Sequence, residues 1–489
     1  MLISLYTIRV VLEILGVEDF GIYNVVGGVV VLFTFLNSAM TSATQRFLNF
    51  ALGQNDTEQA RNVFSVSFVI HVLIAVLVVV LAQTIGLWFF FTWLNIPPER
   101  QTAALVVYQF SVVATVMGIL QVPYRAAIIA HERMAFFAML SIVEAMLRLG
   151  VVFLLPIILF DKLVVYAFLV CITGIIVFII HKLYCNKTFA TARFQYCEDK
   201  GLYRQLLGFS GWSIFGEAAN ISRVQGTNIL VNIFHGVTLN AAMGIAGQVN
   251  AAVYQLVGSF QTAFNPQIIK SYSAQDYDYF MRLIFRTSKI SFYLLFFFVL
   301  PLYINADFVL QIWLGNAPAY TVAFTRLVLF SSLITAIAGP LWVSIQATGD
   351  IKKYQLMISC LIFANMPLSL FFLWVGFSPV WVLITRISVD AFTLIWRIFF
   401  LGKKINLQIM GFFCEVIMPI FIIAGGAVLI TVSVQNLFVG DWSRLIMSCI
   451  ISTVTIGCLV YLAGLNRQEK KLLQEWVNAK IKKKNDCPK

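Results

Sequence analysis

Charged residues are scarce in this sequence. They make up 11% of the 489 residues, whereas 60% are hydrophobic and the mean hydropathy is +0.88. A soluble domain of this size needs a charged and polar surface, so the composition excludes one. Apolar runs of about 20 residues, the length that crosses a bilayer, recur along the whole chain. We therefore expect an all-α polytopic membrane protein.

Motifs for metal binding and catalysis are also lacking. The eight cysteines include no CxxC pair, and His181, Cys185 and Cys197 are too loosely spaced for a zinc site. No phosphate-binding glycine loop and no nucleophile–base set is visible. Asp276-Tyr277-Asp278 is a DxD triplet, as in some metal-dependent sugar transferases, but no nucleotide-binding pattern surrounds it. The sequence therefore predicts neither an enzyme nor a metal site, and a membrane glycosyltransferase or polymerase is the weaker alternative.

The hydropathy pattern predicts fourteen spans joined by short connections. The longest connection, residues 185–205, is polar and basic and divides the chain near its middle. The predicted spans are residues 1–16, 21–45, 62–92, 102–129, 135–159, 163–184, 206–234, 240–266, 287–313, 321–347, 354–375, 380–401, 409–435 and 443–464.

Lysine and arginine are divided unequally between alternate loops. Of the 34 residues of these types, 26 stand in or beside the loops after even-numbered spans and in the C-terminal tail, and the opposite loops hold only Arg100, Lys162 and Arg444. Because cytoplasmic loops carry excess positive charge, we expect both termini in the cytoplasm. The net charge of +12 follows from these loops and does not indicate a nucleic-acid partner.

The two halves of the chain are related by an internal repeat. At an offset of 223 residues Gly21-Ile22 falls on Gly244-Ile245, and Trp93-Leu94 before Pro97 has a counterpart in Trp313-Leu314 before Pro318. Two parallel six-span lobes are expected, with substrate bound between them near the bilayer midplane. The predicted organisation is an N-terminal lobe at 1–184, a cytoplasmic linker at 185–205, a C-terminal lobe at 206–401, two further spans within 402–464 and a basic cytoplasmic tail at 465–489.

The stretch Leu206–His235 carries Glu217 and Arg223 where a span should be apolar. A charge at the bilayer centre costs about 2.5–3.5 kcal/mol on insertion scales, so lipid should not touch it. On a regular helix, which turns about 100° per residue, the polar residues share one arc that Arg223 flanks. That arc could be a polar packing seam or the wall of a substrate path. Its members are Ser213, Glu217, Asn220, Thr227 and Asn228.

Three other spans carry an arginine and an acid four residues apart. This spacing places both side chains on one helix face, where they can neutralise each other. A structural and a functional role remain open for the pairs in 135–159 and 380–401. The first and seventh spans occupy equivalent places in the repeat, so Arg9 and Arg223 are expected to line one cavity, together with polar residues such as Gln248 of the eighth span. The predicted buried pairs are Arg9 with Glu13, Glu144 with Arg148, and Arg386 with Asp390.

The segment Leu15–Asp56, LGVEDFGIYNVVGGVVVLFTFLNSAMTSATQRFLNFALGQND, closely resembles the start of bacterial polysaccharide (Wzx-type, O-antigen) flippases. PYRAAIIAHERM at Pro123–Met134 and IQATGDIKKYQ at Ile345–Gln355 extend the resemblance, which covers nearly the whole chain and the fourteen-span count. The same superfamily contains multidrug and toxin extruders and the lipid II flippase. The resemblance implies a two-lobed alternating-access transporter of the bacterial cytoplasmic membrane. It would move an undecaprenyl-pyrophosphate-linked oligosaccharide, a repeat unit of lipopolysaccharide, capsule or exopolysaccharide, to the outer leaflet.

The resemblance also implies partners and site residues. Membrane lipids, glycosyltransferases and a polysaccharide polymerase are the implied partners, cationic residues in the central cavity hold the pyrophosphate, and the last two spans receive the lipid tail. Arginine stays protonated and can bind two oxygens at once, so Arg223 and Arg9 are the expected ligands. Glu217 would be a counter-ion or a proton site, and Asn220, Asn228 and Gln248 would bind sugar hydroxyls.

No cofactor is expected, and a proton gradient, a sodium gradient and the membrane potential remain open as energy sources. The alternative function is a cation-coupled multidrug or metabolite exporter of the same superfamily. Its cavity should favour acidic and aromatic residues over arginine, and it should have twelve spans.

The sequence allows one prediction for each end of the chain. Under the repeat, Met1 matches Val224 inside the seventh span, so the first span is short by about half and we expect roughly 18 to 25 further residues upstream. In the tail, apolar residues recur at near-helical spacing among lysines, which predicts a helix on the membrane surface. These apolar residues are Leu472, Leu473, Trp476, Val477 and Ile481.

Overall fold

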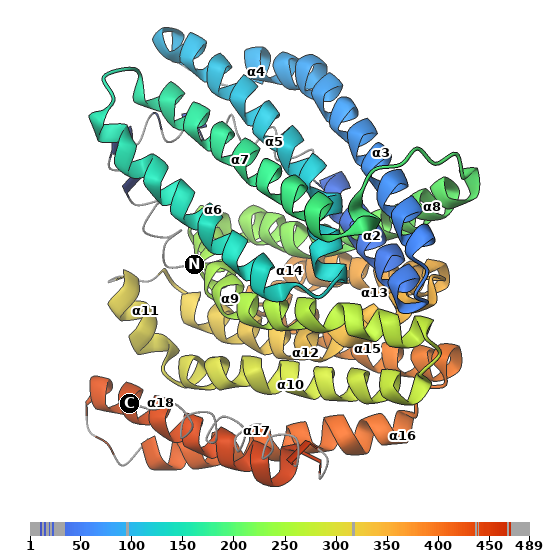
Figure 1. The fold of residues 1–489 in the computed structure, drawn as a ribbon. Coiled ribbons are helices and arrows are strands. Elements are labelled where there is room, and N and C mark those ends of the chain that lie inside the picture. Colours follow the sequence, from blue (N-terminus) through green and yellow to red (C-terminus); the bar gives the residue numbers. More distant parts are fainter. Residues whose placement is uncertain are drawn as a thin grey trace, which may run out of the picture. The chain divides into compact units, whose positions relative to one another are not determined.

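The structure is a computed structural model. It describes residues 10–11, 14–15, 19, 22–23, 35–93, 97–314, 318–435, 438, 440–466 and 469–470. Within these residues the chain consists of helices and short connections and has no strand, as Figure 1 shows. Nine of the described helical segments are long and apolar enough to cross a membrane. The predicted all-α polytopic fold is confirmed, and the expectations for the N-terminal start and for most of the tail helix lie outside the described residues.

The elements are named by their labels in Figure 1. They are α2 (Phe35–Gly53), α3 (Thr57–Leu81), α4 (Leu87–Trp93), α5 (Gln101–Ala130), α6 (Met134–Leu154), α7 (Lys162–Thr188), α8 (Lys200–Ile221), α9 (Thr227–Ser273), α10 (Tyr277–Ile304), α11 (Ala306–Leu314), α12 (Thr321–Thr348), α13 (Lys352–Phe363), α14 (Asn365–Trp374), α15 (Val380–Ile405), α16 (Ile409–Phe412), α17 (Met418–Gln435) and α18 (Asp441–Leu459). Single π-helical turns follow or join several of them, at Ala82–Gly86, Ser222–Gly226, Phe413–Ile417 and Val460–Gly464.

Eight predicted spans coincide with apolar helical segments, a ninth, 287–313, overlaps the segment Tyr277–Ile304, and the total of fourteen stays a prediction. Three more predicted spans, 206–234, 240–266 and 380–401, fall in the helices α8, α9 and α15. No loop separates the predicted spans 206–234 and 240–266, because α9 is helical across residues 235–239. The predicted single span 287–313 is wrong beyond Ile304, because the helix breaks at Asn305, between α10 and α11.

Local sequence signals account for several helix ends. The Asp56 carboxylate accepts a hydrogen bond from the Gln59 amide at 2.8 Å and caps α3. Asp161 caps α7 in the same way through the amides of Leu163 and Val164. Such caps satisfy backbone donors that have no partner within the helix.

The chain forms two compact units. Unit 1 comprises Met1–Ala218, Asn265–Tyr277 and Gln346–Leu356, and unit 2 comprises Ala219–Phe264, Asp278–Ile345 and Met357–Lys489. These boundaries follow contacts within each unit, and the predicted division into lobes, linker, extra spans and tail remains a prediction.

Unit 1 is built around α5, which packs against α7, α3 and α2. Its main apolar cluster surrounds Tyr108, whose hydroxyl donates to the Ala82 carbonyl at 2.6 Å. That carbonyl lies in a π-helical turn and also accepts from the Leu87 amide, so the tyrosine hydroxyl is a second donor to the same oxygen.

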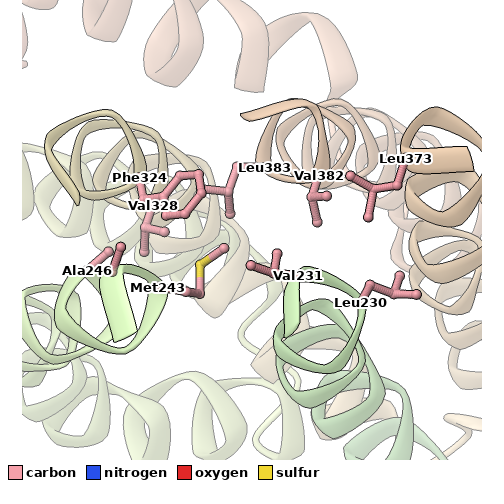
Figure 2. Close-up of a cluster of buried hydrophobic side chains, with 10 residues drawn as sticks. Leu230, Val231, Met243, Ala246, Phe324, Val328, Leu373, Val382 and Leu383 are labelled. Atoms are coloured by element: carbon pink, nitrogen blue, oxygen red, sulfur yellow. The ribbon is translucent and has the colours of Figure 1, made fainter. Parts of the chain in front are cut away.

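Unit 2 has a comparable cluster between α9, α12, α14 and α15 (Figure 2). Figure 2 shows Val231 and Met243 on two helical segments of α9, with both side chains pointing into the cluster beside Phe324. The chain therefore bends between these residues, although its helical hydrogen bonding continues. In a bilayer such a cluster stabilises by close packing rather than by escape from water, because lipid is itself apolar.

Large apolar side chains also cover the outside of the helices. Along α3 and α4, Leu73 is 62% exposed, Val76 56% and Trp88 59%. A surface of this kind is stable only in an apolar solvent. The protein is therefore a multi-pass membrane protein.

The internal repeat has a structural counterpart in unit 1. The turn after α2 has Asn55 at φ 57°, with the Asp56 amide bonded to the Ala51 carbonyl at 3.0 Å. The turn after α9 has Gln275 at φ 61°, with the Asp276 amide bonded to the Ser271 carbonyl at 3.0 Å. Helices that occupy equivalent places in the predicted repeat thus end in the same way.

Candidate functional site

A buried carboxylate on α15 gathers polar side chains from three elements of unit 2. Oδ1 of Asp390 accepts a hydrogen bond from Nη1 of Arg223 at 2.5 Å. Oδ2 accepts one from the hydroxyl of Ser331 on α12 at 2.6 Å, and Nε of Arg386 lies 3.9 Å away. We call Arg223, Ser331, Arg386 and Asp390 the Asp390 cluster.

The charges of this cluster do not balance. Two guanidinium groups, each with a side chain 13% exposed, share one carboxylate that is 7% exposed. In the part of the chain that the structure describes, Nε of Arg223 and Nε of Arg386 have no hydrogen-bond partner. A buried charge without full compensation is costly, so the cluster is suited to receive an anion.

The backbone around Arg223 is irregular. Arg223 lies in the π-helical turn Ser222–Gly226, and its carbonyl accepts a bond from the Thr227 hydroxyl at 2.5 Å. That hydroxyl in turn accepts from the side-chain amide of Asn365 on α14 at 3.4 Å. Single π-turns within α-helices often occur at functional sites.

The π-turn changes which residues lie on the predicted polar arc. It takes one residue more than a turn of α-helix, so residues after Gly226 are rotated by about 100° from their expected direction. Thr227 is buried against Asn365, and Asn228 is half-buried. The arc predicted from Ser213 to Asn228 therefore does not continue through the π-turn.

A third arginine lies near the two arginines of the Asp390 cluster. Arg397 of α15 donates from Nη1 to the Ala338 carbonyl at 3.5 Å. The phenol of Tyr254 on α9 interacts electrostatically with both Arg223 and Arg397. The positive charge thus extends along α15 toward its C-terminal end.

Within the described ranges, Glu217, Asn220 and Gln248 form no hydrogen bond or ion pair with the Asp390 cluster. Glu217 and Asn220 are half-buried and Gln248 is exposed. Among the described residues Glu217 has no ion-pair partner. Arg9 and Glu13 lie outside the described residues.

The two other predicted charge pairs differ from each other. Glu144 and Arg148 bond at 2.7 Å as expected, but their side chains are 38% and 59% exposed, so the prediction that they are buried is wrong. Arg386 and Asp390 are buried, but Asp390 lies nearer to Arg223 than to Arg386, so the prediction of a pair within one helix is incomplete. The second pair belongs to a network between helices.

The cysteine and histidine candidates for zinc bind other groups. His181 contacts the Gln121 amide at 3.0 Å, and the Cys185 thiol donates to the Tyr124 carbonyl at 3.5 Å. Over the described ranges no group of three His, Cys, Asp or Glu side chains could hold a metal ion.

Comparison with solved structures identifies the fold. A multidrug resistance MATE family transporter of the MOP superfamily, in an outward-facing conformation, is similar with a TM-score of 0.68 and 13% identity over 82% of this chain and 92% of that one. A MATE structure in the bent conformation has a TM-score of 0.69 and 14% identity over 82% and 91% of the two chains. This chain has a MATE-like transporter fold.

A third match to this fold is a MOP superfamily transporter from Pyrococcus furiosus. Its TM-score is 0.68, with 13% identity over 84% of this chain and 92% of that one. For that protein, a reversed polarity of the binding pocket suggests a different function. No family model and no curated protein sequence matches the chain. The transporter fold is thus established, and the Wzx-type family remains a prediction.

Sequence reasoning missed three residues of this region. Ser331 is one of several hydroxyl residues in its span, Tyr254 is one aromatic residue among many, and Arg397 stands near the end of the predicted span 380–401 and counts among the loop charges. Of the three, only Arg397 could have been recognised from the sequence, because it is a charged residue within the predicted span 380–401.

Proposed function

We propose that this protein is an alternating-access transporter that moves an undecaprenyl-pyrophosphate-linked oligosaccharide across the bacterial cytoplasmic membrane. The single observation that carries the proposal is the surplus of buried positive charge around Asp390. Arg223 and Arg386 share one carboxylate, and each guanidinium has an Nε without a hydrogen-bond partner among the described residues. A pyrophosphate supplies the missing negative charge.

The cluster suggests how binding would work. Without substrate, Asp390 holds the Arg223 guanidinium at 2.5 Å. An arriving pyrophosphate would compete with Asp390 for Arg223 and pair with Arg386, while Ser331 keeps the Asp390 carboxylate hydrogen-bonded. Interactions with charged groups are strong where water is excluded, so this exchange would distinguish anions from neutral molecules.

The remaining predicted ligands keep their proposed roles. Arg9 would be a second cationic ligand, Glu217 a counter-ion or proton site, and Asn220, Asn228 and Gln248 would serve the sugar. Transport would be driven by a proton or sodium gradient or by the membrane potential. Glycosyltransferases would supply the lipid-linked oligosaccharide and a polymerase would use it.

The second candidate function is a cation-coupled multidrug exporter. It is favoured by the similarity to a structure described as a multidrug resistance transporter, which supports this alternative more directly than the flippase. The arginines around Asp390 weigh against it, because they would repel a cationic drug.

The experiment that separates the two functions replaces Arg223. In cells whose surface polysaccharide depends on this protein, Arg223→Ala and Arg223→Gln should lower export to below about a tenth, since a charge-assisted hydrogen bond contributes about 1.5–3 kcal/mol. Arg223→Lys keeps the charge and should retain part of the export. The control is Arg326→Gln, which removes an arginine that pairs with Asp307 outside the cluster.

Full export by Arg223→Ala at normal expression would overturn the role of Arg223 in the flippase proposal. If cells lacking the protein keep normal surface polysaccharide but lose resistance to cationic drugs, the exporter alternative is correct. Both readouts are made on the same set of variants.

A further inference from the structure

Unit 1 contains a cavity of about 390 Å³. It lies between the end of α2, the first turns of α8 and the loop that joins α12 to α13. Three of its lining residues are cationic, namely Arg46, Arg204 and Lys352, and Asp350 is the one acid on this lining. The residues that line it from α8 include Phe209 and Trp212.

Arg46 is a fixed, buried cation in the wall of the cavity. Its residue is 7% exposed, its Nε donates to the Gln346 carbonyl at 3.0 Å, and its Nη2 donates to the Ala347 carbonyl at 3.2 Å. The guanidinium carbon lies 4.5 Å from the centre of the Phe47 ring and 4.7 Å from that of Phe50. These contacts hold the side chain in one direction.

No carboxylate neutralises Arg46 among the described residues, since its partners are backbone carbonyls and aromatic rings. Burial lowers its pKa to about 10, which still leaves it protonated at neutral pH. Gly349, at φ 79°, allows this approach, because a Cβ there would lie 2.5 Å from Nη2 of Arg46. The loop is thus shaped to place a permanent positive charge beside the cavity.

The other two cations, Arg204 and Lys352, are exposed at the rim of the cavity. The ammonium of Lys352 lies 5.3 Å from the centre of the Trp212 ring, and Arg204 stands two turns before Trp212 on α8. Within the described residues neither Arg204 nor Lys352 forms an ion pair. A fixed guanidinium with two adaptable cations is a favourable arrangement for an oxyanion with several oxygens.

The apolar part of the lining suggests what carries that oxyanion. Phe47 and Phe209 pack edge to face at 5.9 Å, and Trp212 adds an indole ring, a group enriched at membrane interfaces. The charge bias of the loops predicts that this end of the helices faces the cytoplasm. The cavity therefore combines a cationic wall with an apolar wall at the level of lipid headgroups.

We propose that this cavity binds a phosphate ester, and that its occupant is the headgroup of an anionic membrane lipid. A bound phosphate would join α2, α8 and the α12–α13 loop, three segments that are distant in the sequence. Binding would therefore stabilise unit 1, by an amount that grows with ligand concentration. A soluble phosphate compound has the same chemistry and is the other source that the experiment must distinguish.

The experiment measures thermal unfolding of the full-length protein in a neutral detergent. Phosphatidylglycerol should raise the unfolding temperature, phosphatidylcholine should not, and inorganic phosphate or pyrophosphate at the same concentration should have a smaller effect. Arg204→Gln and Lys352→Gln should each raise the phosphatidylglycerol concentration at half-effect about tenfold, which corresponds to one charged hydrogen bond.

Lys353→Gln is the matched control, because it removes the same charge from an exposed neighbour that does not line the cavity. Arg223→Ala should respond to lipid as the unaltered protein does, so failure of the transport proposal would not affect this result. An equal response of all variants to phosphatidylglycerol would overturn the proposal. A larger response to pyrophosphate than to lipid, lost in Arg204→Gln and Lys352→Gln, would overturn the lipid assignment in favour of a soluble ligand.

Discussion

Nζ of Lys289 lies 2.7 Å from Oε2 of Glu469, and the lysine side chain is only 2% exposed. This ion pair joins α10 to the chain beyond α18, where Glu469 also accepts from the backbone amide of Asn466 at 2.8 Å. Nε of Arg286 lies 4.0 Å from the other oxygen of Glu469. The start of the C-terminal tail is therefore attached to α10 through one carboxylate that is 12% exposed.

Replacing Lys289 by methionine should destabilise this attachment. The substitution leaves Glu469 with only the more distant Arg286, and removing one partner of a buried pair costs about 3–5 kcal/mol, so the loss here should be near 3 kcal/mol. Thermal unfolding should show a lower midpoint for Lys289→Met than for Lys289→Met combined with Glu469→Gln. Equal midpoints for the single and double variants would mean that the pair is not shielded from water.

Asp390 offers a test that separates structure from binding. Asp390→Asn removes the carboxylate charge, so Arg223 and Arg386 repel each other without compensation and the unfolding temperature should fall. Under the proposed function the same change frees Arg223, so affinity for pyrophosphate should rise several-fold. Isothermal titration of the purified protein measures this affinity.

The double variant Arg223→Gln with Asp390→Asn is the control for that experiment. It removes one charge of each sign, so stability should recover while pyrophosphate affinity falls below that of the unaltered protein. Weaker pyrophosphate binding by Asp390→Asn alone would argue that Asp390 positions the site rather than competing for it.

Gly86 should not tolerate alanine. A Cβ at this position would lie 2.1 Å from the Tyr108 hydroxyl oxygen, so the side chains must shift, at a cost of about 1–3 kcal/mol. Tyr108→Phe alone removes its bond to Ala82 and should cost about 1 kcal/mol. In the combined variant the nearest ring atom is 3.3 Å from the new Cβ, so the two losses should not add. Additive losses in thermal unfolding would contradict this explanation.

His131, in the turn between α5 and α6, should make stability depend on pH. Its ring stacks on Phe189 at 4.1 Å and its Nε2 lies 2.8 Å from the Thr191 hydroxyl. Burial, with the charges of Lys270 and Arg133, lowers its pKa from 6.5 to about 4. The folded protein therefore binds fewer protons than the unfolded chain, and this contribution to stability is complete above pH 6.5 and is lost as pH falls toward 4.

The measurement compares unfolding temperatures at pH 7.5 and pH 4.5. The difference between the two should be smaller in His131→Gln than in the unaltered protein. An unchanged difference would show that other groups cause the acid sensitivity.

The fold could be predicted from the sequence as far as apolar length determines it. Segments such as Thr57–Thr92 and Lys162–Thr188 have few charges and are longer than the roughly 20 residues that a span needs, so their hydropathy places them directly. The break at Asn305 could not be predicted in this way. Its side-chain amide donates to the Pro301 carbonyl and to Ser448 of α18, a partner 143 positions away.

For the candidate site, too, the sequence predicts neighbours on one helix but not partners on other helices. The spacing of Arg386 and Asp390 correctly placed both on one helix, and the charge of Arg223 marked an unusual span. Nothing in the sequence indicates that Asp390 binds Arg223 across 167 positions rather than Arg386 across four. Local periodicity predicts which residues share a helix face, whereas partners on other helices depend on the packing of the whole unit.

The π-helical turn at Ser222–Gly226 determines how any residue-by-residue survey of this segment must be read. If single cysteines are introduced along 206–235 and tested with a water-soluble reagent, reactivity should rise and fall with the period of an α-helix as far as Ile221. It should then resume from Thr227 about 100° out of phase. A survey fitted to one continuous wave would average the two parts and assign the wrong side of the helix to the water-filled path.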